Sequence, residues 1–315
     1  ELALKHWGDP AIEWIFLQQK LDLVSVHGAA GADAICVFVN DQLDAPVLQA
    51  LKDLGILFIA LRCAGYNNVD LPTAKQLGFT LVRVPAYSPQ AVAEHSVGLM
   101  LCLSRKFHKA YNRTRDNNFD LNGLLGFNLH GKTIGVVGTG RIGTAAVRIL
   151  RGFGCRVLCM DPVQDPQVIA MGAEYVDAEQ LYPQADIISL YCPLTPDTLH
   201  LINSQSLEKM KDGVMLINTS RGALVDTKAV IKALKSSKIG YLGLDVYEQE
   251  ADLFFKDLSD QIIADEVFQR LLTFPNVLIT GHQAFFTAEA MEQISCITSD
   301  NLLQLARGEH CPNTI

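Results

Sequence analysis

The sequence predicts an α/β protein with two doubly wound domains, each built around a parallel sheet. Short apolar runs alternate with amphipathic segments along the chain, which is the rhythm of strand–helix–strand units. The length of 315 residues also exceeds the roughly 100–200 residues of one ordinary domain.

Composition excludes several classes of protein. The chain is 49% hydrophobic and 19% charged, which is too apolar for a disordered chain. Its net charge of −8 argues against a nucleic-acid partner, and no apolar run reaches the roughly 20 residues of a membrane helix. The eight cysteines form no CxxC pair and no zinc-ligand spacing. We therefore expect no metal site, no membrane contact, and reduced thiols in a cytoplasmic protein.

The first part of the chain reads as one set of strands and helices. Apolar runs predict strands at residues 12–16, 34–39, 57–61 and 80–84. A helix is predicted at 46–54, where Gly55 ends it. The next helix begins with Ser88 and Pro89 and runs from 90 to about 111. Its first half is apolar on nearly every side, so we expect it to be covered at a domain or subunit interface.

A second series of strands follows, at residues 133–137, 156–160, 187–190, 214–218, 241–246 and 277–280. The last helix is predicted at 288–307. Because this helix follows the second series, we expect it to return to the first domain. The prediction is a discontinuous domain of residues 1–86 and 285–315, and a second domain of residues 87–284.

A glycine-rich turn joins the strand at 133–137 to a helix. In GxGxxG order, Gly138 permits the tight turn, Gly140 lets a pyrophosphate approach the backbone, and Gly143 allows close helix packing. The next strand ends at Asp161, where a carboxylate accepts hydrogen bonds from the adenine ribose. No arginine stands in the next three residues to bind a 2′-phosphate. The second domain is therefore predicted to be a Rossmann domain that binds NAD rather than NADP.

Three ionisable residues stand just beyond predicted strands of the second series, namely Arg221, Glu250 and His282. The carboxyl ends of parallel strands meet at the edge of the sheet where ligands bind. Together the three provide a cation for a carboxylate, an acid–base group, and a carboxylate that favours the charged imidazole.

The sequence resembles the NAD-dependent D-2-hydroxyacid dehydrogenases, and within them the fermentative lactate branch. The resemblance rests on residues 62–68, 84–89, 138–143, 218–222, 245–250 and 281–285, with 252–257 and 311–313 typical of the lactate branch. It implies a flavodoxin-like substrate domain and a cleft between the two domains. Because the family opens with a strand and an initiator methionine that do not precede Glu1, we expect the first strand to be missing.

The resemblance also implies roles for individual residues. His282 is the expected proton donor, Glu250 its partner, and Arg221 the clamp on the substrate carboxylate. Further substrate contacts are expected from Ala64, Gly65, Tyr87 and Phe285. For NAD it implies, besides the glycines and Asp161, contacts from Arg141, Ile142, Cys192, Pro193, Thr198, Thr219, Ser220 and Asp245. The histidine of the 93–95 motif, His95, is interpreted as structural.

The expected activity is reversible reduction of pyruvate to D-lactate by NADH. Two alternatives stay open: a dehydrogenase for a larger 2-oxo acid, and a non-catalytic NADH-sensing protein of the corepressor type. The expected partners are a small 2-oxo or 2-hydroxy acid and a second copy of the chain. The NAD domains are expected to pair, giving a homodimer or homotetramer.

Overall fold

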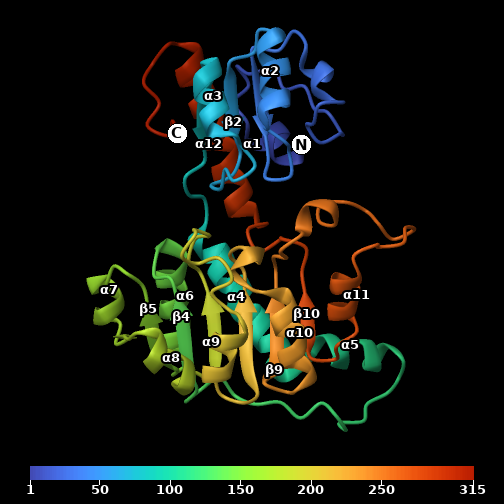
Figure 1. Ribbon diagram of the computed structural model, residues 1–315, viewed down its shortest axis with the longest axis vertical. Helices are drawn as coiled ribbons and strands as arrows, with labels where there is room; N and C mark the ends of the chain where they lie inside the picture. The colour runs from blue at the N-terminus through green and yellow to red at the C-terminus, as the bar shows by residue number, and fades with distance from the viewer. The chain divides into compact units, whose positions relative to one another are not determined.

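The computed structural model describes the backbone of all 315 residues and every side chain except that of Asp252. The chain forms two compact units (Figure 1). Unit 1 consists of Glu1–Ser88 and Phe286–Ile315, and unit 2 is Pro89–Phe285. Each contains one parallel sheet, of three strands in unit 1 and seven in unit 2, so the predicted fold class is confirmed.

Unit 1 has the sheet order β1-β2-β3, with β1 at Ala34–Val37, β2 at Phe58–Leu61 and β3 at Thr80–Arg83. Its helices are α1 (Leu2–Trp7), η1 (Val26–Ala29), α2 (Ala45–Asp53), α3 (Leu71–Leu77) and α12 (Ala288–Ala306). α2 and α3 begin at Asp44 and Asp70, whose carboxylates accept backbone N–H groups of the first turn. α12 packs on α1, β2 and β3, so the end of the chain completes the unit that its beginning starts.

The strand predicted at 12–16 is wrong. This segment is irregular and pairs with no strand in the described part of the chain. Ile15 is 74% exposed, so the apolar run lies at the surface instead of inside a sheet. An apolar run forms a stable strand only where a neighbouring strand takes up its backbone hydrogen bonds.

Unit 2 has the sheet order β10-β9-β8-β7-β4-β5-β6, and every pair is parallel. The strands are β4 (Thr133–Val137), β5 (Arg156–Met160), β6 (Glu174–Tyr175), β7 (Ile187–Leu190), β8 (Val214–Asn218), β9 (Ile239–Leu244) and β10 (Val277–Ile279). The strand order reverses between β4 and β7, and the crevice at such a point is where doubly wound sheets bind ligands.

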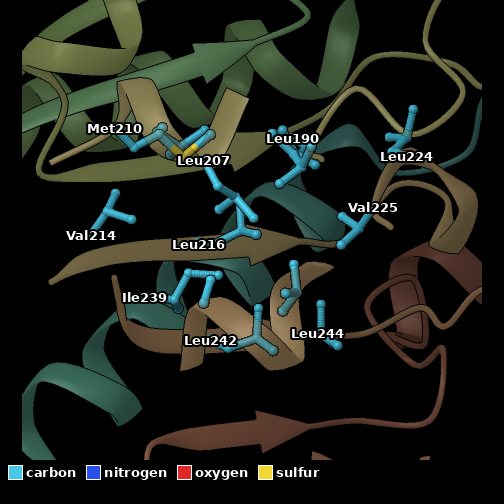
Figure 2. Packing of buried hydrophobic residues seen from close by; sticks show 14 of the residues in the cluster. Leu190, Leu207, Met210, Val214, Leu216, Leu224, Val225, Ile239, Leu242 and Leu244 are labelled. Atoms are coloured by element: carbon cyan, nitrogen blue, oxygen red, sulfur yellow. The ribbon is translucent and has the colours of Figure 1, made fainter. Parts of the chain in front are cut away.

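The helices of unit 2 are α4 (Pro89–Arg105), α5 (Phe107–Arg115), α6 (Arg141–Gly152), α7 (Pro166–Ala170), α8 (Ala178–Gln184), α9 (Ser204–Lys209), α10 (Thr227–Lys235) and α11 (Glu266–Leu272), with short 3₁₀ turns η2 (Gly222–Leu224) and η3 (Glu250–Asp252). One face of the sheet packs into an apolar core. Figure 2 shows Leu216 of β8 and Leu242 of β9 in this core with Leu207 of α9. This dense packing fixes the strand ends that carry the site.

The helix predicted from residue 90 to about 111 differs from expectation in two ways. It is interrupted at Lys106, whose φ of 55° lies in the left-handed region, so α4 and α5 are separate helices. The apolar side chains of α4 are buried as predicted, but α6 and strands β8 and β9 of the same unit cover them. The expected covering by another domain or subunit is therefore not needed for this face.

Candidate active site

The glycine turn after β4 leaves backbone open to a ligand. Gly138 has φ 94°, and a Cβ added there would lie 2.5 Å from the backbone nitrogen of Cys192. A Cβ on Gly143 would lie 2.0 Å from the Gly138 carbonyl oxygen. At Gly140, by contrast, nothing lies within 4 Å of an added Cβ. The outer glycines are required by packing, whereas the middle one keeps space above the backbone.

That space lies at the start of α6, where the helix supplies unpaired N–H groups. No side chain caps this end, so the amides of Arg141 and Ile142 remain available to an anion. Asp161, at the end of β5, accepts hydrogen bonds from the backbone N–H of Thr139 (2.7 Å) and of Val163 (2.8 Å). These bonds hold its carboxylate beside the glycine turn, where the ribose of a dinucleotide is expected.

Most of the other residues predicted to bind NAD follow β7, which is next to β4, and β8, which is next to β7. Ser220 donates to the Cys192 carbonyl (2.7 Å), which ties the loops after β8 and β7 together, and Thr198 donates to the Pro193 carbonyl (2.7 Å) within the loop after β7. Thr219 has a buried hydroxyl oxygen without a hydrogen-bond partner among the described residues. An unpaired buried hydroxyl is costly, so a ligand group that satisfies it fits this place. Together with the open Gly140, this makes the crevice suitable for NAD.

Cys192 lies at the same edge with its side chain buried. Burial raises the pKa of its thiol to about 11, so the group is uncharged at neutral pH. It is therefore a small apolar group rather than a nucleophile, and its expected contact with NAD stays a prediction.

His282 and Glu250 form a close pair. The Nδ1 atom of His282 lies 2.7 Å from Oε1 of Glu250, and Oε2 of Glu250 accepts the backbone N–H of Tyr247 at 2.9 Å. The side chains are 17% and 25% exposed. Because a carboxylate only accepts, Nδ1 carries a proton, and Nε2 has no partner in the described part of the chain. Nε2 is therefore the atom available to a substrate.

The turn that carries His282 is held by Asp245. His282 has φ 53°, a left-handed conformation that is strained for a residue with a side chain. Its N–H donates to the Asp245 carbonyl (2.7 Å), and the Asp245 carboxylate accepts from the N–H groups of Gln283 and Ala284 (2.9 Å each). Thr280 also donates to this carboxylate.

Asp245 is fully buried in this position. Burial alone raises the pKa of its carboxyl, but hydrogen bonds from His95, Thr280 and the turn outweigh it and lower the pKa below its usual value. His95 Nε2 also lies 3.0 Å from Thr280 Oγ1, so His95 supports the turn from α4. The nicotinamide contact expected of Asp245 stays a prediction beside this structural role.

Arg221 follows β8 and is half-buried. Gly222 lets its loop lie directly on the next one, because a Cβ there would be 2.1 Å from the Tyr247 carbonyl carbon. The guanidinium donates to the Ser220 carbonyl at 2.7 Å, and no carboxylate of the described residues lies within 4 Å of it. An arginine without an acid partner is a suitable binding group for a substrate carboxylate.

The structure adds one aromatic residue that the sequence did not single out. The Phe255 ring centroid lies 5.6 Å from that of His282, and the predicted Phe285 lies 6.5 Å away, edge-on. Phe255 belongs to the 252–257 stretch, in which the side chain of Asp252 lies outside the described residues. That stretch was the only signal for Phe255 in the sequence.

Ala64, Gly65 and Tyr87 lie in unit 1, with Ala64 and Gly65 in the loop after β2. Their place beside His282 stays a prediction. Within the described residues, no group of three His, Cys, Asp or Glu side chains is arranged to hold a metal ion. No helix of the described chain has the length and apolarity needed to cross a membrane.

Comparison with known proteins identifies the family of the chain. The family model described as "D-isomer specific 2-hydroxyacid dehydrogenase, NAD binding domain" matches residues 97–284. A D-lactate dehydrogenase of Escherichia coli is 57% identical over 287 residues, which are 91% of this chain and 87% of that protein.

Solved structures point to the same family. A structure of D-lactate dehydrogenase from Escherichia coli superposes with a TM-score of 0.92 at 51% identity, covering 100% of this chain and 96% of the other. A Salmonella D-lactate dehydrogenase gives 0.88 at 55% identity, with the same coverage. The resemblance seen in the motifs is thus confirmed over the whole chain, which is an NAD-dependent oxidoreductase and belongs to the D-2-hydroxyacid dehydrogenase family.

Proposed function

We propose that the protein catalyses the reversible reduction of pyruvate to D-lactate by NADH. The observation that carries the proposal is the His282–Glu250 pair, 2.7 Å apart, with Nε2 of the imidazole left to a substrate. Relatives at 57% and 51% identity bear the name D-lactate dehydrogenase, which supports the choice of substrate.

The reduction needs a proton as well as a hydride. When bound, NADH would supply the hydride that adds to C2 of the 2-oxo acid. As the carbonyl oxygen gains negative charge, protonated His282 hydrogen-bonds it through Nε2 and then gives up that proton. Glu250 opposite Nδ1 stabilises the imidazolium before transfer and keeps the ring oriented throughout. In the reverse direction, neutral His282 takes the hydroxyl proton.

The substrate carboxylate is proposed to bind between two sets of donors. The planar guanidinium of Arg221 offers two parallel N–H groups, which match a carboxylate. The backbone N–H groups of Ala64 and Gly65, in the loop after β2, are proposed as the second set. Fixing the carboxylate at both sides orients C2 toward the hydride donor, and such positioning contributes much of the rate of a two-substrate reaction.

The cofactor is proposed to bind along the β4–β7 crevice. The start of α6 holds the pyrophosphate through Arg141 and Ile142, Asp161 holds the ribose, and the Thr219 hydroxyl gains a partner. The carboxylate of Asp161 disfavours a 2′-phosphate, so NAD is preferred to NADP.

The size of the pocket is proposed to depend on Phe285 and Tyr87. A ring 6.5 Å from that of His282 limits the room at C3 of the substrate. A branched or aromatic 2-oxo acid must then displace protein, at a cost of about 1–3 kcal/mol. We expect pyruvate to be preferred over 2-oxoisocaproate and phenylpyruvate, and Phe285→Ala to reduce that preference.

We further propose that the protein works in the cytoplasm as a homo-oligomer joined through unit 2. The support for pairing is an exposed apolar segment in and after α5 rather than the buried face of α4. Its large apolar side chains are between 50% and 87% exposed: Phe107, Tyr111, Phe119, Leu121 and Leu125. Several large exposed apolar side chains within one short segment are typical of a protein interface. Light scattering that gives the mass of a monomer at micromolar concentration would contradict it.

The test follows NADH oxidation at 340 nm with a panel of 2-oxo acids. We expect turnover with pyruvate, and a loss of about 10²–10⁴-fold in kcat for His282→Gln with NADH binding intact. Arg221→Lys keeps the charge but loses the fork, so KM for pyruvate should rise steeply while the Kd for NADH stays constant. Faster turnover of phenylpyruvate than of pyruvate would reassign the substrate. NADH binding without any turnover would instead identify a sensor.

A further inference from the structure

The loop after β2 presents two backbone N–H groups without partners. Those of Ala64 and Gly65 have no acceptor among the described residues, although both residues are only partly exposed. Unpaired N–H groups in sequence form a natural binding place for an anion. The orientation of these N–H groups is set by hydrogen bonds to the carbonyls of the same peptide groups.

The carbonyls of the same peptide groups both accept hydrogen bonds, from Arg83 at the end of β3 and from Val84, which follows it. The Cys63 carbonyl accepts the backbone N–H of Val84 at 3.3 Å, and the Ala64 carbonyl accepts Nη1 of Arg83 at 2.9 Å. A trans peptide is planar, and its C=O and N–H point in opposite directions. The bond from Arg83 to the Ala64 carbonyl therefore fixes the direction of the Gly65 N–H, pointing away from the guanidinium.

We propose that Arg83 is a positioning residue for the substrate carboxylate, acting through the Ala64–Gly65 peptide group. This rests on the proposed function, in which the Gly65 N–H binds that carboxylate. The donor is charged, so the bond is stronger than one between neutral groups and polarises the peptide, which makes the Gly65 N–H a better donor.

Arg83 is itself held in place. Its backbone N–H donates to the Asn313 carbonyl (3.1 Å), and its own carbonyl accepts the Asn301 side chain (2.9 Å). The guanidinium lies 5.2 Å from the ring centroid of Tyr66, in the same loop. No carboxylate of the described residues lies within 4 Å of it, so its charge is not neutralised locally. The side chain thus bridges β3 to the loop and leaves a positive charge behind the amides.

The test compares Arg83→Met, which keeps the stem but removes the donor and charge, with Arg83→Lys, which keeps the charge. Arg307→Gln is the control, because it removes an exposed charge of the same unit at the end of α12. The measurements are KM and kcat for pyruvate, the Kd of oxamate with the NADH complex, the Kd of NADH, and the melting temperature. Oxamate is the probe because it carries the carboxylate of pyruvate but does not react.

For Arg83→Met we expect KM for pyruvate and Kd for oxamate to rise about 10-fold, of the order of one hydrogen bond to a charged group. kcat should change less than about 3-fold, and the Kd of NADH should stay constant. Arg83→Lys should recover part of the loss, and Arg307→Gln should match the wild type.

Oxamate binding in Arg83→Met within 2-fold of the wild type would overturn the inference. So would an equal loss of oxamate binding, NADH binding and thermal stability in both Arg83 variants, because that pattern belongs to a residue needed only for folding. A failure of the proposed function looks different: the wild type would not turn over pyruvate, whatever the Arg83 variants do to oxamate binding.

Discussion

Replacing Asp245 by asparagine tests whether a buried carboxylate keeps His282 in its strained turn. The two carboxylate oxygens accept the N–H groups of Gln283 and Ala284, and Thr280 also donates to one of them. Asparagine has one oxygen and one NH₂ group of nearly the same size. Whichever way it points, one N–H of the turn faces another donor, and the remaining bonds lose the benefit of the charge.

The loss can be worked out from these contacts. One hydrogen bond to a charged group is worth about 1.5–3 kcal/mol, and the left-handed conformation of His282 costs roughly 1–2 kcal/mol that the turn then no longer offsets. We expect Asp245→Asn to lower the free energy of unfolding by about 2.5–5 kcal/mol. In a unit of this size, about 2–4 °C of melting temperature corresponds to each kcal/mol. kcat for pyruvate should fall by about 10–100-fold as the imidazole loses its orientation.

The contribution of Asp245 to the free energy of unfolding changes with pH in a definite direction. Hydrogen bonds hold the pKa of Asp245 below its usual value in the folded state, despite the opposing effect of burial. A carboxyl with a lowered pKa adds stability above its unfolded pKa of about 3.9, and this contribution is lost as the pH falls through the folded value. The gap between wild type and Asp245→Asn should therefore be constant from about pH 5 to 7 and shrink below pH 4.

Urea unfolding at several pH values and steady-state kinetics measure both effects. Asp177→Asn is the matched control, since its exposed carboxylate caps α8 through one N–H and asparagine caps equally well. The free energy of unfolding of this control should stay within about 0.5 kcal/mol of the wild-type value. A variant at Asp245 that keeps wild-type kcat and melts within 1 °C of the wild type would refute the role given to this carboxylate.

Other substitutions separate packing from binding. Gly140→Ala should leave stability unchanged but raise the Kd of NADH, because a methyl group there meets only open space. Gly138→Ala should lower stability by 2 kcal/mol or more in urea unfolding, because φ is 94° and the backbone of the next loop is 2.5 Å away. Glu250→Gln keeps a hydrogen bond to the imidazole but loses its charge, so kcat for pyruvate reduction should fall roughly 10–100-fold while NADH titrations stay normal. Iodoacetamide at pH 8 should label exposed Cys296 well before Cys192, whose pKa is about 11, as mass spectrometry of digests will show.

Much of unit 2 could be predicted because buried parallel strands are continuous apolar runs with sharp ends. β4, β5, β7 and β8 occur within the bounds expected, and the glycine turn lies where its spacing places it. β6 was missed, since a two-residue strand carries no pattern. β9 begins two residues earlier than predicted, at Ile239, because Gly240 interrupts the apolar run.

The errors elsewhere have a common cause. Apolar residues at 12–16 form no strand. The helical pattern predicted from residue 90 continued past Lys106, although the backbone turns there. In both places the local sequence is compatible with regular structure, but the surrounding chain decides whether its hydrogen bonds can be made. The same holds for Asp245 and Arg83, whose positioning roles depend on carbonyl and amide groups far away in the sequence or in a neighbouring loop.

The register of the sheet places the loops that carry the proposed catalytic groups next to one another. Asn218 of β8 pairs with Leu244 of β9, and Leu244 pairs with Ile279 of β10, so the three lie side by side. Arg221 and His282 each stand three residues beyond this level, on the strands to either side of β9. β9 itself contributes Asp245 directly at its end, followed by the longer loop to Glu250.

This arrangement explains why residues far apart in the sequence can act as one site. A single-residue insertion after β8 or β10 would advance the chain by about 3.3 Å. That is more than the tolerance of a hydrogen bond such as the 2.7 Å contact of His282 with Glu250. The buried carboxylate of Asp245 and the close approach allowed by Gly222 tie the three loops to one another as well as to the sheet. The spacing from strand end to catalytic group is therefore as much a part of the site as the groups themselves.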